Sequence, residues 1–104
     1  MLLFFLFMFS PPQVDFHCEV YGVMHEVEDP RRADYIVYEE NSESFADLII
    51  YDHDNRLYAD KPGIWHFVKN ARRARYRLYF TKDRDQAHFS VYFTDYESFA
   101  GCNR

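Results

Sequence analysis

The sequence predicts a small α/β domain in which six to seven short strands alternate with single-turn helices in a 13-residue repeat. The first observation is an alanine that recurs at this spacing and follows a helix-start signal in every copy. The second is a period-two alternation of apolar residues after each alanine, which is typical of a strand. The third is composition, since 20% of the residues are aromatic and only three are glycine, which favours half-buried strand surfaces. A length of 104 residues allows one such domain.

The repeat is defined by six alanines with gaps of 13 residues, except for one gap of 15. They are Ala33, Ala46, Ala59, Ala74, Ala87 and Ala100. Four of them are followed five residues later by a tyrosine, at Tyr38, Tyr51, Tyr79 and Tyr92. In the exception, the segment 61–63 lengthens the unit by two and residues 65–67 take the matching place. We interpret the tyrosines as cross-strand packing residues whose hydroxyls reach water.

Each alanine is preceded by aspartate or asparagine, which can cap the first turn of a helix. The capping residues are Asp29, Asn41, Asp54, Asn55, Asn70, Asp83 and Asp95. Pro30 follows the first of them and suits the first helical position. Because only a few residues separate these signals from the alanines, one turn is all that fits. Alanine lets two backbone segments approach closely without the entropy loss of glycine, so six tight crossings are expected.

The alternation after each alanine assigns the strand faces. In one strand we expect Tyr76, Leu78 and Phe80 to face inward and Arg75, Arg77 and Tyr79 to face outward. In the next, Phe89, Val91 and Phe93 share one face and His88, Ser90 and Tyr92 the other. The earlier strands, around residues 36–37 and 48–50, are apolar on both faces and are expected to lie deeper.

The repeat unit resembles that of the septoil-knot domain family. The matching units are residues 32–38 (Arg-Ala-Asp-Tyr-Ile-Val-Tyr), 45–51 (Phe-Ala-Asp-Leu-Ile-Ile-Tyr), 58–60 (Tyr-Ala-Asp) and the closing segment 91–101. Members are small bacterial domains of unknown function whose chain is tied in a seven-crossing knot. The resemblance covers about residues 19–104 and implies a compact, deeply knotted fold, which is rare among proteins. Periodicity alone fits an open solenoid as well, and Arg75, His88 and Gly101 replace the aspartate in later units.

Residues 1–16 form an apolar tail that precedes the repeat domain of residues 17–104. The tail is too short to cross a bilayer, and it could be a weak signal peptide, a membrane-surface anchor or a disordered extension. Cys18 and Cys102 lie at the two ends of the repeat domain and could form one disulfide if the protein is exported. We expect a cytoplasmic location in preference to export, and a monomer without a transmembrane span.

The charges are unevenly distributed along the chain. Residues 15–60 hold 13 acidic and three basic residues, whereas the segment from Lys69 to Arg84 holds seven basic residues and one acidic. The two segments could attract each other within one fold, or the basic one could bind an anionic partner such as a nucleic acid, another polyanion or a protein. Arginines neutralise phosphates and aromatic rings stack on bases. The candidate anion-binding residues are therefore Arg72, Arg73, Arg75, Arg77 and Tyr79.

The sequence predicts no catalytic residue, no cofactor and no metal site. Residues 52–55 (Asp-His-Asp-Asn) are the most ligand-like cluster, but they occupy loop and cap positions where such residues are expected anyway. His66 and His88 take the places of tyrosine and aspartate in other units and are interpreted as surface variation. We therefore expect a non-enzymatic structural or interaction domain that resists unfolding. The alternative is a binding module that recognises an anionic partner through residues 69–84.

Overall fold

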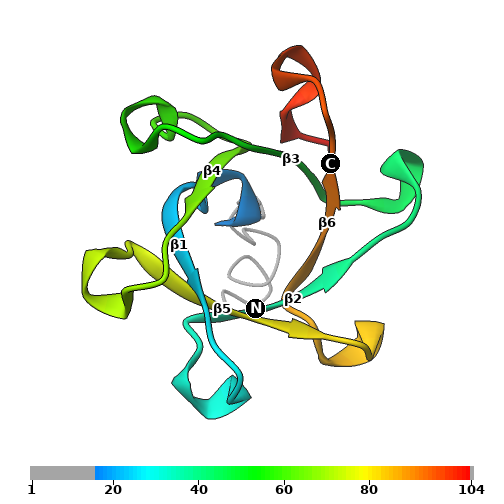
Figure 1. Cartoon of the computed structure of the whole chain (residues 1–104). Coiled ribbons are helices and arrows are strands. Elements are labelled where there is room, and N and C mark those ends of the chain that lie inside the picture. The colour runs from blue at the N-terminus through cyan, green and yellow to red at the C-terminus, as the bar shows by residue number, and fades with distance from the viewer. Residues whose placement is uncertain (1–15, 104) are drawn as a thin grey trace, which may run out of the picture.

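The computed structural model describes residues 16–103, which form a closed barrel of six parallel strands with a seventh, two-residue strand beside it (Figure 1). The barrel strands are β1 (Gly22–Glu26), β2 (Tyr35–Glu39), β3 (Leu48–Asp52), β4 (Ile64–Phe67), β5 (Tyr76–Thr81) and β6 (Phe89–Phe93), and the last strand is β7 (Gly101–Cys102). Short 3₁₀ helices connect them: η1 (Phe16–Glu19), η2 (Pro30–Arg32), η3 (Glu43–Phe45), η4 (Arg56–Tyr58), η5 (Ala71–Arg73), η6 (Arg84–Gln86) and η7 (Glu97–Phe99). The apolar tail of residues 1–15 lies outside the described residues.

The strand order interleaves the two halves of the chain. Around the barrel the order is β4-β1-β5-β2-β6-β3, and β3 pairs again with β4 to close the ring. Every strand of the second half therefore lies between two strands of the first half. The chain travels around the barrel in one circuit through β1, β2 and β3, and then fills the gaps in a second circuit through β4, β5 and β6.

The connections are unusually short for parallel strands. They contain between seven and eleven residues and project outward from the ring, each carrying one 3₁₀ turn at its tip (Figure 1). Parallel pairs ordinarily need a crossover of a dozen or more residues. Here Met24 pairs with Tyr76 while Leu78 pairs with Tyr35, so neighbouring strands are staggered and tilted. Because the strands are short as well as tilted, a connection has little distance to cover before the next strand begins.

The expected helical turns are present only as three-residue 3₁₀ turns, so the domain is strand-rich rather than an alternation of strands and α-helices. The physical reason is length, because three residues close an i→i+3 bond such as Ala33 N–H to the carbonyl oxygen of Pro30 but no i→i+4 ladder. Four of the expected caps accept a backbone N–H two residues ahead: Asp29, Asn55, Asn70 and Asp83. Asn41 and Asp95 are not caps, since the N-cap positions of η3 and η7 belong to Ser42 and Tyr96. Asp54 is not a cap either, because Asn55 holds the N-cap position of η4.

The repeat alanines end these turns, and five of them have extended backbone. Ala59, at the unit lengthened by the insertion, is the exception with a ψ of 61°. The first residue of each turn accepts the N–H of the alanine that follows it. Ala46 is fully buried and Ala59 nearly so, while the other four are partly buried. The requirement for a small side chain is therefore strictest at Ala46 and Ala59, the second and third of the repeat alanines.

The central layer of the core holds six side chains, one from each barrel strand, and Val20, Leu48 and Phe89 extend the buried cluster. All six have no measurable exposure: Met24, Val37, Ile50, Trp65, Leu78 and Val91. Each lies nine residues before a repeat alanine, so the 13-residue repeat places them at the same height. The inward assignment of Leu78 and Val91 is confirmed, and so is the depth of β3, in which residues 48–50 are all buried.

Candidate functional site

The two mouths of the barrel differ. Because all six strands are parallel, their first residues surround one mouth and their last residues the other. At the first mouth, the ring of Phe16 in η1 stacks on Tyr35 with centroids 5.8 Å apart and meets Phe89 edge-on at 6.0 Å. Val20, just after η1, is buried and accepts a hydrogen bond from the indole of Trp65. The N-terminal turn thus closes this mouth.

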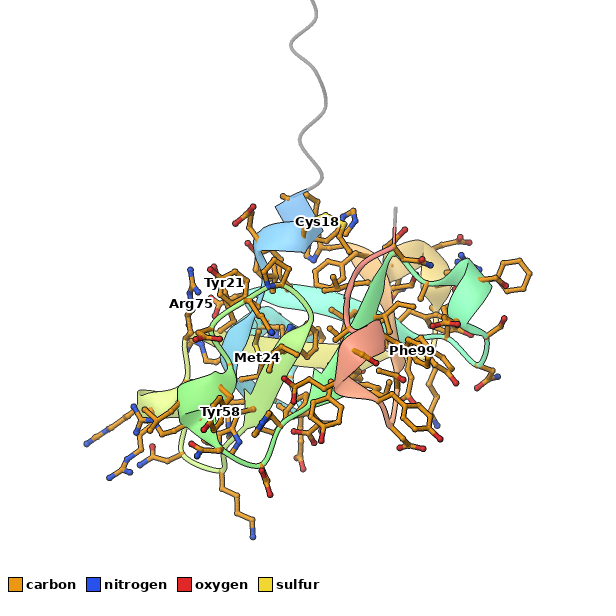
Figure 2. The ribbon with its side chains drawn as sticks, turned by 90° about the horizontal axis from the view of Figure 1, so that it is seen from above. Cys18, Tyr21, Met24, Tyr58, Arg75 and Phe99 are labelled. Atoms are coloured by element: carbon orange, nitrogen blue, oxygen red, sulfur yellow. A yellow bond between two sulfur atoms is a disulfide. The ribbon has the colours of Figure 1, made fainter. Side chains whose placement is uncertain are left out.

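A disulfide fastens the closed mouth. Cys18 in η1 is bonded to Cys102 in β7, which joins positions 84 residues apart, and Figure 2 shows Cys18 at this end of the molecule with Met24 deeper inside. His17 lies beside the bond, and its ring nitrogen and the two sulfurs fall within 4.8 Å of one another. Within residues 16–103 this is the one group of three potential metal ligands that converges. The two sulfurs are bonded to each other and are therefore not thiolates, the form that ligates metals.

The predicted anion-binding segment lies across η5 and β5. Arg72 and Arg73 are exposed on η5. The guanidinium of Arg75 lies over the rings of Tyr21 and Tyr76, 5.0 and 5.2 Å from their centroids, and donates to the carbonyl oxygen of Tyr21 (Figure 2). Cation–π contacts therefore hold the Arg75 side chain against these two tyrosine rings on the outer surface of the barrel.

Two other arginines of the basic segment pair with the acidic half of the chain. Arg77 lies 3.7 Å from Asp34, and Arg84 lies 2.9 Å from Glu40. Glu40 is buried, so Arg84 compensates a carboxylate that has left water. Attraction between the two oppositely charged segments is thus present inside the fold.

The structure brings together three of the five candidate anion-binding residues. Arg72, Arg75 and Arg77 line a cavity of about 400 Å³ together with Asp34. The Asp34 carboxylate lowers the positive potential of that cavity. Tyr79 is outside its lining and pairs with Ile36 on the outer side of β5.

The cluster at residues 52–55 does not converge on one point. The ring of His53 stacks on Tyr58, with centroids 4.8 Å apart, and accepts the backbone N–H of Asn55. Asn55 caps η4, while Asp52 lines a different cavity at the barrel mouth. The cluster therefore serves turn formation and packing.

The second mouth of the barrel is an open bowl of about 320 Å³. Six residues line it: Glu26, Glu39, Asp52, Phe67, Phe80 and Phe93. The three acids come from β1, β2 and β3 and the three phenylalanines from β4, β5 and β6, so the interleaved strand order makes acid and phenylalanine alternate around the rim. In each strand the residue that lines the bowl lies two positions after the residue of the central core layer. The lining residues therefore form the next layer of the barrel.

The phenylalanines form a regular triangle at the base of the bowl. The ring centroids of Phe67, Phe80 and Phe93 are 6.2 Å apart in all three pairs, with interplanar angles of 40° to 47°. All three are partly buried, while the three acids are exposed. An aromatic floor thus lies inside a carboxylate rim.

One carboxyl of the rim titrates unusually. Burial raises the pKa of Asp52 above its ordinary value, and the charges of His66 and a hydrogen bond from Phe67 partly oppose that effect. The nearby charge of Asp54 raises the pKa of Asp52 further. Burial of its carboxyl therefore raises the pKa of Asp52 overall.

This bowl was not predicted from the sequence, although the repeat contains a signal for it. Each of its residues lies seven positions before a repeat alanine, with an acid in the first three units and phenylalanine in the last three. The repeat shows that these six positions are equivalent. Only the strand order shows that the two sets alternate around one opening.

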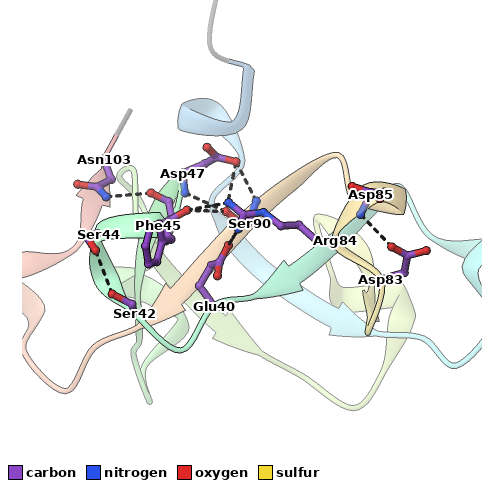
Figure 3. A network of polar contacts seen from close by, with 11 residues as sticks. Glu40, Ser42, Ser44, Phe45, Asp47, Asp83, Arg84, Asp85, Ser90 and Asn103 are labelled. Atoms are coloured by element: carbon purple, nitrogen blue, oxygen red, sulfur yellow. Dashed lines mark hydrogen bonds and ion pairs between the residues drawn. The ribbon is translucent and has the colours of Figure 1, made fainter.

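Two polar residues assigned to surface variation have structural roles. His88 accepts the backbone N–H of Ile36 at 2.8 Å, and His66 contacts the carbonyl oxygen of His53 at 2.7 Å. In the equivalent position after alanine, Asp47 accepts the N–H of Ser90, which is buried (Figure 3). His88 therefore replaces aspartate as an acceptor for the backbone of the neighbouring strand.

The comparisons with known proteins add a family. A family model described as the 7(1) septoil knot domain matches residues 17–103, which is most of the chain. No curated protein and no solved structure matches this chain. None of the helices in the described part of the chain is long and apolar enough to span a bilayer.

Proposed function

Because the chain belongs to the septoil-knot domain family, we propose that it is a non-enzymatic, monomeric domain whose knotted chain resists unfolding. The observation that carries the proposal is the strand order, in which each strand of the second circuit lies between two strands of the first. A chain that winds twice around one closed barrel in this way must pass its end across the earlier circuit. Full unfolding then requires that end to be drawn back.

The tightest passage supports this threading. Gly63, at the start of the second circuit, has a φ of +86° and lies so close to Gly101 that the backbone there leaves no space for a Cβ atom. A Cβ at Gly63 would also come within 2.8 Å of the carbonyl oxygen of Ile49 in β3. Segments from the first circuit, the second circuit and the C-terminal end therefore meet at one point.

The disulfide would make such a knot permanent. With Cys18 bonded to Cys102, the barrel becomes part of a closed covalent ring. A closed ring cannot change its knot type without breaking a bond. Unfolding of the oxidised protein would then give a compact denatured ring that is still knotted. Such a ring would refold without having to form the knot again.

The order of folding and oxidation tests the knot. Chemically synthesised chain that has never folded is divided into two batches, one folded before oxidation and one oxidised in denaturant. We expect the ring that was closed after folding to regain its native amide spectrum after a cycle of denaturation. The ring that was closed before folding should not reach that spectrum. Equal refolding of the two rings would show that the fold is unknotted. The first batch is the control for foldability of the synthetic chain.

A second candidate function is binding of a polyanion through residues 69–84, and the exposed Arg72 and Arg73 on η5 favour it. The test replaces both with serine and follows binding to heparin and single-stranded DNA as salt rises, because phosphate contacts weaken with salt. The matched control replaces Arg31 and Arg32 on η2, which are equally exposed. Absence of binding by the parent protein at low salt removes this candidate.

A further inference from the structure

The bowl at the second mouth has the features of a ligand site, independently of the topology of the chain. Its volume of about 320 Å³ is at the small end of the range for ligand pockets. The three phenylalanines in its lining are apolar and partly buried, and the three acids are charged and exposed. The opposite mouth is filled by η1 and its disulfide, so the bowl is the end of the barrel that a ligand can enter.

The composition of the lining selects a cation. Three carboxylates face the bowl and the six lining residues include no lysine or arginine. The faces of aromatic rings carry negative potential and attract cations within about 6 Å of the centroid. Since acids and phenylalanines alternate around the opening, a cation at its centre has a ring or a carboxylate on every side.

The geometry favours an organic cation over a metal ion. A metal needs oxygen or nitrogen ligands that converge on one point. Glu26, Glu39 and Asp52 are separated by phenylalanines, and they do not form a convergent ligand group among the described residues. A diffuse, methylated or alkylated ammonium group needs no such convergence and gains from contact with the rings.

We propose that the bowl binds an organic ammonium ion, with the head group over Phe67, Phe80 and Phe93 and the carboxylates of Glu26, Glu39 and Asp52 around it. The small volume fits one ammonium head and its methyl groups. The same chemistry is offered by a free quaternary amine or by a methylated lysine side chain of a protein. Burial raises the pKa of Asp52, and a cation held beside its carboxyl opposes that effect by favouring the ionised form.

The test is a titration of the oxidised protein with choline at low salt, followed by proton NMR. Rings in face contact shift the N-methyl protons of choline upfield, so the shift reports the predicted geometry as well as binding. The comparison ligand is 3,3-dimethylbutan-1-ol, which has the shape of choline without its charge. We expect binding and an upfield shift for choline and neither for the neutral alcohol.

Three variants locate the site. Phe80→Leu keeps an apolar side chain and should weaken choline binding by about fivefold to tenfold. Glu39→Gln removes one rim charge from an exposed position, so folding is retained, and should weaken binding by about threefold to fivefold. Glu43→Gln is the control, because Glu43 is an exposed acid outside the bowl and its loss should change nothing.

Two results would overturn the proposal. One is equal binding of choline and the neutral alcohol, which would make the bowl a simple apolar pocket. The other is absence of an upfield shift for choline, or a shift that Glu39→Gln and Glu43→Gln leave equally intact. A trimethyllysine peptide identifies the source of the cation, since affinity at least about tenfold above that of choline indicates a protein ligand and equal affinity a small molecule.

Discussion

The indole Nε1 of Trp65 donates a hydrogen bond to the carbonyl oxygen of Val20 across 2.8 Å, and both residues are buried. Trp65 belongs to β4, the first strand of the second circuit, while Val20 follows the turn that closes the first mouth. This bond joins the centre of the barrel to its N-terminal plug. It also satisfies a polar group in a layer where the other five side chains are apolar.

Trp65→Phe should lower the free energy of unfolding by about 2–3 kcal/mol, because it leaves the buried carbonyl of Val20 unpaired and a gap beside it. Urea unfolding followed by circular dichroism measures the loss. Phe67→Leu, on the same strand but partly exposed in the bowl, is the matched aromatic control and should cost less. A Trp65→Phe variant as stable as Phe67→Leu would contradict the role of the bond.

Gly63→Ala should abolish folding or destabilise the domain severely, because the new Cβ would overlap the backbone of Gly101 and approach that of Ile49. Gly101→Ala is the control, since its φ of +144° is also unfavourable for alanine but no atom lies within 4 Å of the new Cβ. Its cost should be about 1–2 kcal/mol, from backbone strain alone. Thermal unfolding of the two variants compares them, and equal effects would show that close approach at Gly63 is unimportant.

Asp47→Ala should destabilise the domain by about 1–2 kcal/mol. Its carboxylate accepts the N–H of buried Ser90 at 3.0 Å, and its own N–H donates to the Ser90 hydroxyl at 3.1 Å (Figure 3). Asp60 occupies the same place after its alanine but is exposed, at the unit lengthened by the insertion. Asp60→Ala should therefore have little effect, and an Asp60 loss as large as that of Asp47 would refute the assignment. Denaturant unfolding midpoints give both values.

Arg84→Met should destabilise the domain by about 1–3 kcal/mol, because it leaves the buried Glu40 carboxylate without its cation. Arg31→Met removes an exposed ion pair with Asp29 and should produce no measurable change. Urea unfolding midpoints compare the two variants, and equal stability of both would contradict compensation of the buried Glu40 carboxylate by Arg84.

Asp52→Asn should stabilise the domain at neutral pH. The folded pKa of Asp52 lies above its ordinary value of 3.8, so the folded state binds more protons between these two values and stability falls as pH rises through that window. The gain from Asp52→Asn should therefore be present above the folded pKa and vanish below 3.8. Unfolding midpoints across this pH range, with Glu43→Gln as the control, provide the measurement. A gain that is the same at all pH values would show that ionisation of Asp52 is not its source.

Local sequence patterns are sufficient to predict most of the short elements of this protein. The alanine spacing located the turns η2 to η7, the aspartates and asparagines located four of their six caps, and alternation identified Leu78 and Val91 as core residues. The turn η1 has no repeat alanine and was not predicted. These features depend on interactions within a few residues, so a pattern of a few residues encodes them. The sequence predicted helical turns without specifying their type. They are 3₁₀ turns because three residues close an i→i+3 hydrogen bond and are one residue too few for an i→i+4 bond.

Which strands are neighbours can be seen only in the folded barrel. The repeat makes all six strands look alike, so it cannot state that β5 lies between β1 and β2 or that β3 closes on β4. That order sets the pairing of Arg84 with Glu40, the role of His88 beside Ile36, and the alternation of acids and phenylalanines around the bowl. The physical reason is that these contacts join different repeat units, with |i−j| of 52 for Ile36 and His88, and local sequence carries no information about which other unit a strand will meet.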